Sequence, residues 1–85
     1  VSVSAYVAEC QRVLMERGLT HQMHPYGTVV EGEWDAVMDA LRACHERVHA
    51  MGAPRISTSL RLGTRIDREQ SMQDKLSSVQ RLLQP

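Results

Sequence analysis

Residues 55–66 form the most constraining pattern in this chain, because polar and less polar side chains alternate there without interruption. A β-strand points successive side chains to opposite faces of its sheet, so this period of two predicts a strand with one covered face. The face expected to lie against helices carries Ile56, Thr58, Leu60, Leu62, Thr64 and Ile66. The opposite, polar face carries Arg55, Ser57, Ser59, Arg61, Gly63 and Arg65. The pattern therefore predicts a sheet with helices packed on one side.

Three other segments show the helical period. Apolar residues recur at intervals of three and four along them, which predicts three helices with one apolar face each. These faces consist of Val3, Val7, Cys10 and Leu14 in the first helix, Trp34, Val37, Met38, Leu41, His45 and Val48 in the second, and Met72, Leu76, Val79 and Leu83 in the third.

Residues suited to helix ends mark the limits of these segments. Ser2 or Ser4 can cap the first helix, because a serine oxygen accepts from a backbone N–H of the first turn. Gly18 and Gly52 follow the first and second helices, where a left-handed residue usually ends a helix. Ser71 begins a sequence resembling a capping box, so we expect the third helix to start there.

Two short extended runs, residues 19–25 and 28–32, meet at a Pro-Tyr-Gly sequence typical of a reversing turn. The predicted order is therefore helix, hairpin, helix, strand, helix within a single domain spanning residues 1–85. The fold class is α+β, and the order matches a ferredoxin-like βαββαβ arrangement with an extra C-terminal helix. The first strand of that arrangement, which lies in the middle of the sheet, is missing. We expect a segment ahead of residue 1, or a partner chain, to supply it.

Size and charge limit the possible functions. A chain of 85 residues and 9.6 kDa buries only about 63% of its unfolded surface, which favours an oligomer over a monomer. Ten basic and ten acidic residues give zero formal charge, which argues against binding to duplex nucleic acid. The apolar runs are too short to cross a membrane.

The two cysteines, Cys10 and Cys44, are too few for a secreted disulfide framework. Both lie within apolar helical patterns, so we interpret them as buried thiols. We expect a cytoplasmic protein, and the sequence contains no pattern that indicates a cofactor.

His45-Glu46-Arg47-Val48-His49 matches the H-E-x-x-H motif of zinc hydrolases, and Gly52 extends the match. Arg55 stands where the longer motif has its third histidine, and an arginine does not ligate metals. His45 also continues the apolar face of its helix, so packing explains it without a metal. We therefore expect no metal site and no enzyme activity, and keep a zinc hydrolase as a remote alternative.

Several motifs, in order along the whole chain, resemble a known family. They are Ser4-Ala-Tyr-Val-Ala-Glu9, Tyr26-Gly-Thr-Val-Val-Glu-Gly32, Glu33-Trp-Asp-Ala-Val-Met38, Gly52-Ala-Pro-Arg55, Arg65-Ile-Asp67 and Gln73-Asp-Lys75. Together they resemble the small thiamine-binding proteins with a ferredoxin-like fold. Leu62-Gly-Thr-Arg65 is similar to the fungal extracellular-mutant branch. The hairpin motif followed by Trp-Asp is the most specific part.

The resemblance implies a non-enzymatic protein that binds thiamine or its hydroxymethylpyrimidine part. It also implies a homotetramer built as a dimer of dimers. Many relatives carry acidic residues where Gly63 and Thr64 stand here, so candidate counter-charges for the thiazolium ring are missing. A phosphorylated or different ligand therefore stays open.

An aminopyrimidine needs a flat apolar wall together with hydrogen-bonding groups in fixed places. The candidate binding residues are Tyr26, Thr28, Glu31, Trp34, Ser57, Ser59, Arg61 and Arg65. The serines and arginines suit a phosphate or carboxylate, although the arginines equally suit a subunit interface. The main alternative to ligand binding is thus an oligomeric regulatory or scaffold module of the same fold.

Overall fold

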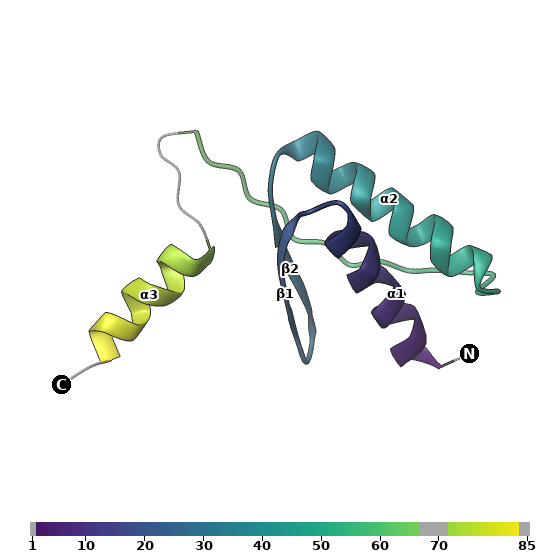
Figure 1. Ribbon diagram of the computed structural model, residues 1–85, viewed down its shortest axis with the longest axis horizontal. Coiled ribbons are helices and arrows are strands. Elements are labelled where there is room, and N and C mark those ends of the chain that lie inside the picture. Colours follow the sequence, from purple (N-terminus) through teal and green to yellow (C-terminus); the bar gives the residue numbers. More distant parts are fainter. Residues whose placement is uncertain (1, 67–71, 84–85) are drawn as a thin grey trace.

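The computed structural model describes residues 2–66 and 72–83. This part of the chain is α+β, with helices around a two-stranded antiparallel sheet (Figure 1). The elements are α1 (Val3–Glu16), β1 (Thr20–His24), β2 (Gly27–Glu31), α2 (Trp34–Ala50) and α3 (Met72–Leu83). The three predicted helices and the predicted hairpin are confirmed.

α1 begins and ends where the sequence predicts. The Ser2 side chain accepts a hydrogen bond from the backbone N–H of Ala5 at 3.3 Å, so Ser2 rather than Ser4 is the cap. Gly18 follows the helix with φ +66, a left-handed conformation that favours glycine. This turn leads the chain directly into β1.

β1 and β2 form a tight hairpin. Thr20 pairs with Glu31 at the open end and His24 pairs with Gly27 at the tip. Only Pro25 and Tyr26 lie between the last pair, which confirms the predicted turn. The hairpin therefore presents Tyr26 at its tip, where its side chain is 97% exposed.

α1 and α2 pack against each other in opposite directions (Figure 1). Arg17 near the end of α1 pairs with Asp39 early in α2, whereas Glu9 pairs with Arg47 late in α2. Arg47 also binds Glu16 through both terminal nitrogens. These ion pairs lie along the edge of the helix pair and hold it in one register.

The core lies between these two helices and the hairpin. Val13, Leu14, Ala40 and Cys44 form its buried cluster. Cys10, Leu19, Val30 and Ala43 pack against that cluster. Of the predicted apolar face of the first helix, Leu14 is buried, whereas Val3 is 73% exposed. In the first turn of α1, Val3 and Ser4 are exposed, whereas Ala5 and Tyr6 are half-buried.

The predicted strand at residues 55–66 was also wrong, because this segment forms no strand. It runs back past the hairpin as an irregular chain, drawn in green in Figure 1. Alternation specifies the face that each side chain takes, but a strand also needs the backbone groups of a neighbouring strand. Within the described residues, β1 and β2 pair only with each other. Leu60, Leu62 and Ile66 consequently remain exposed.

α3 lies beyond the hairpin, apart from the other two helices (Figure 1). Its predicted start at Ser71 lies outside the described residues. Its predicted apolar face is not buried: Leu76, Val79 and Leu83 are exposed. Among the helices that the structure describes, none is both long enough and apolar enough to span a membrane.

Candidate functional site

A groove of about 780 Å³ runs between the hairpin, the packed helices and residues 56–62. Its lining is largely apolar. The apolar side chains include Leu14, Val30, Val37, Leu41, Val48 and Ile56. Small-molecule sites commonly enclose about 300–1,000 Å³ and combine an apolar lining with a few polar groups. The groove has the size and character of such a site.

Polar groups lie along the same groove. The Thr28 hydroxyl on β2 accepts a hydrogen bond from Gln11 Nε2 on α1 at 3.0 Å. On the opposite side, His45 Nε2 and Thr58 Oγ1 are hydrogen bonded at 2.6 Å. Arg61 also lines the groove, and its side chain has no hydrogen bond or ion pair to the described part of the chain. Its guanidinium is therefore available to a ligand.

The groove brings together four of the eight predicted binding residues. Tyr26 and Thr28 come from the hairpin, and Ser59 and Arg61 from the segment after α2. These residues are distant in sequence and meet because that segment returns past the hairpin. Their proximity makes the groove the candidate site.

The other four predicted residues do not line the groove. Glu31 accepts a hydrogen bond from the backbone N–H of Met72 at 2.7 Å, which links β2 to α3. Trp34 begins α2 and is 52% exposed, so its ring is neither core nor groove. Ser57 and Arg65 are exposed on the irregular segment.

The histidines of the H-E-x-x-H motif are engaged outside any metal site. His45 binds Thr58, and His49 Nδ1 lies 2.7 Å from the carbonyl oxygen of Ala53. Their ring centroids are 6.4 Å apart. Within residues 2–66 and 72–83, no three His, Cys, Asp or Glu side chains are placed to share a metal ion. The two histidines instead connect α2 with the chain that follows it.

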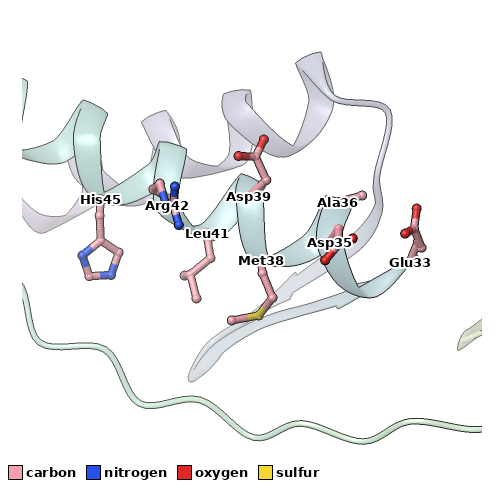
Figure 2. A pocket seen from close by; sticks show the side chains of 8 residues that line it. All are labelled: Glu33, Asp35, Ala36, Met38, Asp39, Leu41, Arg42 and His45. Carbon is pink, nitrogen blue, oxygen red and sulfur yellow. The ribbon is translucent and has the colours of Figure 1, made fainter.

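A second cavity, of about 840 Å³, lies on the outer side of α2. Figure 2 shows Met38, Leu41 and His45 projecting toward the returning chain, whereas Asp39 points away from it. The first three residues also line the groove, so the two cavities adjoin. Glu33, Asp35 and Asp39 are exposed, which makes the second cavity an open depression with an acidic rim.

The predicted buried thiols are confirmed in part. Cys44 is buried and Cys10 is half-buried, and both are free cysteines. Burial, together with the neighbouring Cys10 thiol, raises the pKa of the Cys44 thiol to about 12. The neutral thiol donates a hydrogen bond to the Cys10 carbonyl oxygen at 3.8 Å. Cys44 is therefore a packing residue and a poor nucleophile.

Comparison with known proteins identifies the family of the chain. Residues 1–80 match the family described as "Thiamine-binding protein". The chain belongs to the thiamine-binding protein family. The resemblance that the sequence motifs indicate is thus confirmed.

Curated members of this family carry the name UPF0045. The UPF0045 protein sll0230 of Synechocystis is 60% identical over 84 residues, covering 99% of this chain and 69% of the relative. The UPF0045 protein ECM15 of Eremothecium gossypii is 44% identical over 82 residues, covering 96% of this chain and 78% of the relative. The UPF0045 protein YqgV of Bacillus subtilis is 35% identical, with 99% and 85% covered.

Among the groove residues that the sequence-based site prediction missed are Gln11, Thr58 and His45. The sequence gives no indication that Gln11 lies in a site, because a polar residue in an amphipathic helix is expected to face solvent. Thr58 was expected on the covered face of a strand. His45 did carry a signal: it follows Leu41 by four residues on one helix face. The spacing predicts that His45 packs on the same helix face as Leu41, and in the structure this face of α2 lines the groove.

Proposed function

We propose that this protein is a non-enzymatic binding protein for thiamine or for a hydroxymethylpyrimidine-containing or phosphorylated relative. The observation that carries the proposal is the groove, in which Tyr26, Thr28, Ser59 and Arg61 surround an apolar lining. Membership of a family described as thiamine-binding supports the same class of ligand.

The proposed binding mode follows from the chemistry of these side chains. Tyr26 offers an aromatic face for a pyrimidine ring, and Thr28 a hydroxyl for a ring nitrogen. Ser59 and Arg61 suit oxygen atoms of a substituent. Glu31, Trp34, Ser57 and Arg65 lie outside the groove, and they enter the proposal only as residues that a larger ligand would meet.

We propose further that the complete fold is ferredoxin-like and that the protein assembles as a homotetramer, a dimer of dimers. The accessible surface is 7119 Å², whereas a compact monomer of this mass exposes about 5,000 Å². This larger accessible surface supports an assembly in which other subunits cover part of the chain. The free thiols of Cys10 and Cys44 support a reducing compartment, which we propose to be the cytoplasm.

Calorimetric titration with thiamine, thiamine phosphate and hydroxymethylpyrimidine tests the function. We expect a dissociation constant in the micromolar range or tighter for at least one of them, weakened by Thr28→Val. A flat heat trace for all three would refute the proposal. Thr20→Val is the matched control, because Thr20 lies on the paired strand outside the groove.

The second candidate function is an oligomeric regulatory or scaffold module without such a ligand. Exposed Leu60, Leu62 and Ile66 favour it, because apolar side chains of this kind commonly lie in interfaces. Melting measured over about a hundredfold dilution tests assembly, since an obligate oligomer melts at lower temperature when dilute. Assembly without any ligand binding would favour this candidate.

The remote alternative is a zinc hydrolase that uses His45 and His49. One equivalent of zinc per chain after dialysis, lost in His45→Ala, would revive it. We expect neither zinc nor hydrolysis, because both imidazoles are hydrogen bonded to neighbouring residues.

A further inference from the structure

Among the described residues that line the groove, Arg61 is the one with a permanent charge. His24, His45 and Arg61 line it, and none of the described residues that line it is Asp or Glu. Glu33 and Asp35 line only the adjoining depression on α2. Among the described residues, a ligand inside the groove therefore meets a guanidinium and two imidazoles but no carboxylate.

Nearby carboxylates are engaged elsewhere. Glu9 and Glu16 bind Arg47, and Asp39 binds Arg17, all along the α1–α2 edge. These pairings also keep both arginines away from the groove. The charge of Arg61 is thus not compensated by an ion pair within the described part of the chain.

This charge distribution favours anionic over cationic ligands among the pyrimidine compounds of the proposed function. A thiazolium cation gains no counter-charge in the groove and is repelled by Arg61. A phosphate monoester gains a charge-assisted contact, because the planar guanidinium fork matches two phosphate oxygens. Ser59 lies in the same lining, and its hydroxyl can donate to one of the remaining oxygens.

We infer that the groove is specific for an anionic ligand, a phosphomonoester of a small ring compound, with Arg61 as the residue that binds the phosphate. This inference rests on the proposed function and narrows its ligand. The ring lies against the apolar lining near Tyr26, and the phosphate lies at the Arg61 end. Uncharged and cationic relatives bind more weakly, since they make no charge-assisted contact with Arg61.

Calorimetry on paired ligands tests the inference with the full chain. Hydroxymethylpyrimidine is compared with its phosphate, thiamine with thiamine monophosphate, and inorganic phosphate is titrated alone. Because a charge-assisted hydrogen bond is stronger than a neutral one, we expect phosphorylation to tighten binding about tenfold or more. Inorganic phosphate alone should bind far more weakly than either ester.

Arg61→Gln keeps a long polar side chain but removes the charge. We expect it to abolish the gain from phosphorylation, and to weaken binding of the phosphate ester far more than binding of hydroxymethylpyrimidine. Arg55→Gln is the matched control, because Arg55 is exposed on the same segment but does not line the groove. Circular dichroism of both variants verifies that they fold.

Each outcome is decisive. Equal affinity for phosphorylated and unphosphorylated ligands would overturn the inference while leaving the proposed function intact. So would a gain from phosphorylation that survives Arg61→Gln, or inorganic phosphate binding as tightly as the esters. No binding by any ring compound would instead refute the proposed function itself, as expected if a protein segment fills the groove.

Discussion

Glu31 and Met72 connect the hairpin with α3: the Glu31 carboxylate at the end of β2 accepts a hydrogen bond from the first backbone N–H of α3 at 2.7 Å. The first N–H groups of a helix have no partner within the helix, and a negative charge near them is favourable. Glu31 satisfies one of these groups across a long separation in sequence. It is thus an anchor for α3.

Glu31→Ala should loosen α3, because it removes the acceptor of the Met72 N–H. One hydrogen bond of this kind contributes about 0.5–1.5 kcal/mol, so amide hydrogen exchange in α3 should accelerate several-fold. Glu31→Gln keeps an acceptor oxygen and should retain most of the protection. Exchange that is equally slow in Glu31→Ala and in the exposed control Glu33→Ala would count against this role.

Arg47→Gln should lower the melting temperature, because Arg47 joins α2 to two glutamates of α1. Its guanidinium holds the pKa of Glu16 below the ordinary value, and Arg12 together with Arg47 does so for Glu9. Arg42→Gln is the control, since Arg42 is exposed on α2 and makes no ion pair within the described residues. Equal melting of the two variants would show that the ion pairs add no stability.

The same contact gives a pH dependence with a definite sign. A carboxylate whose folded pKa is lowered stabilises the fold above its ordinary pKa, and this contribution disappears as pH falls through the folded value. Acid should therefore reduce the melting temperature of the unmodified protein more than that of Arg47→Gln. Parallel acid profiles for both proteins would contradict the assignment.

Gly18→Ala should destabilise the fold through backbone conformation alone. Gly18 has φ +66, and nothing lies within 4 Å of the position that a Cβ would take. A non-glycine residue in this region costs about 1–2 kcal/mol. Gly63→Ala is the matched control, because that position is equally open and lacks a positive φ. Urea unfolding in which both variants match the unmodified protein would disprove the strain argument.

Cys44 should resist alkylation in the native protein at mildly alkaline pH. Burial raises its pKa from an ordinary 9.0 to about 12, so the folded protein keeps the thiol neutral where the unfolded chain ionises it. The resulting stabilisation is complete below pH 9 and is lost as pH rises toward 12. Mass spectrometry after iodoacetamide treatment, with a denatured sample as reference, measures this. Equal labelling in both samples would contradict it.

Local features of this fold were predictable from the sequence because local interactions determine them. Ser2 caps α1 through an atom three residues away, and Gly18 ends the helix through its own φ. The hairpin follows from a turn between two extended runs. The observed limits of its two strands differ from the predicted limits by about one residue.

Features that depend on neighbours were not predictable in the same way. Alternation along 55–66 indicated a strand, yet a strand requires a second backbone, and no periodicity supplies one. Val3 and Val13 lie on the same helix, but only Val13 meets α2 and is buried. Thr28 and Arg61 were each predicted as site residues, but the sequence did not show that they line the same groove. Glu31 was predicted as a third site residue, and in the structure it contacts Met72 and lies outside the groove.

The most direct test of the account is a two-dimensional ¹H–¹⁵N NMR titration of the full chain with thiamine monophosphate. The account predicts saturable shifts concentrated at groove residues, above all Tyr26, Thr28, Ser59 and Arg61, with α3 little affected. No shifts at saturating ligand, or shifts confined to α3 and the outer face of α2, would contradict the claim that this groove is the binding site.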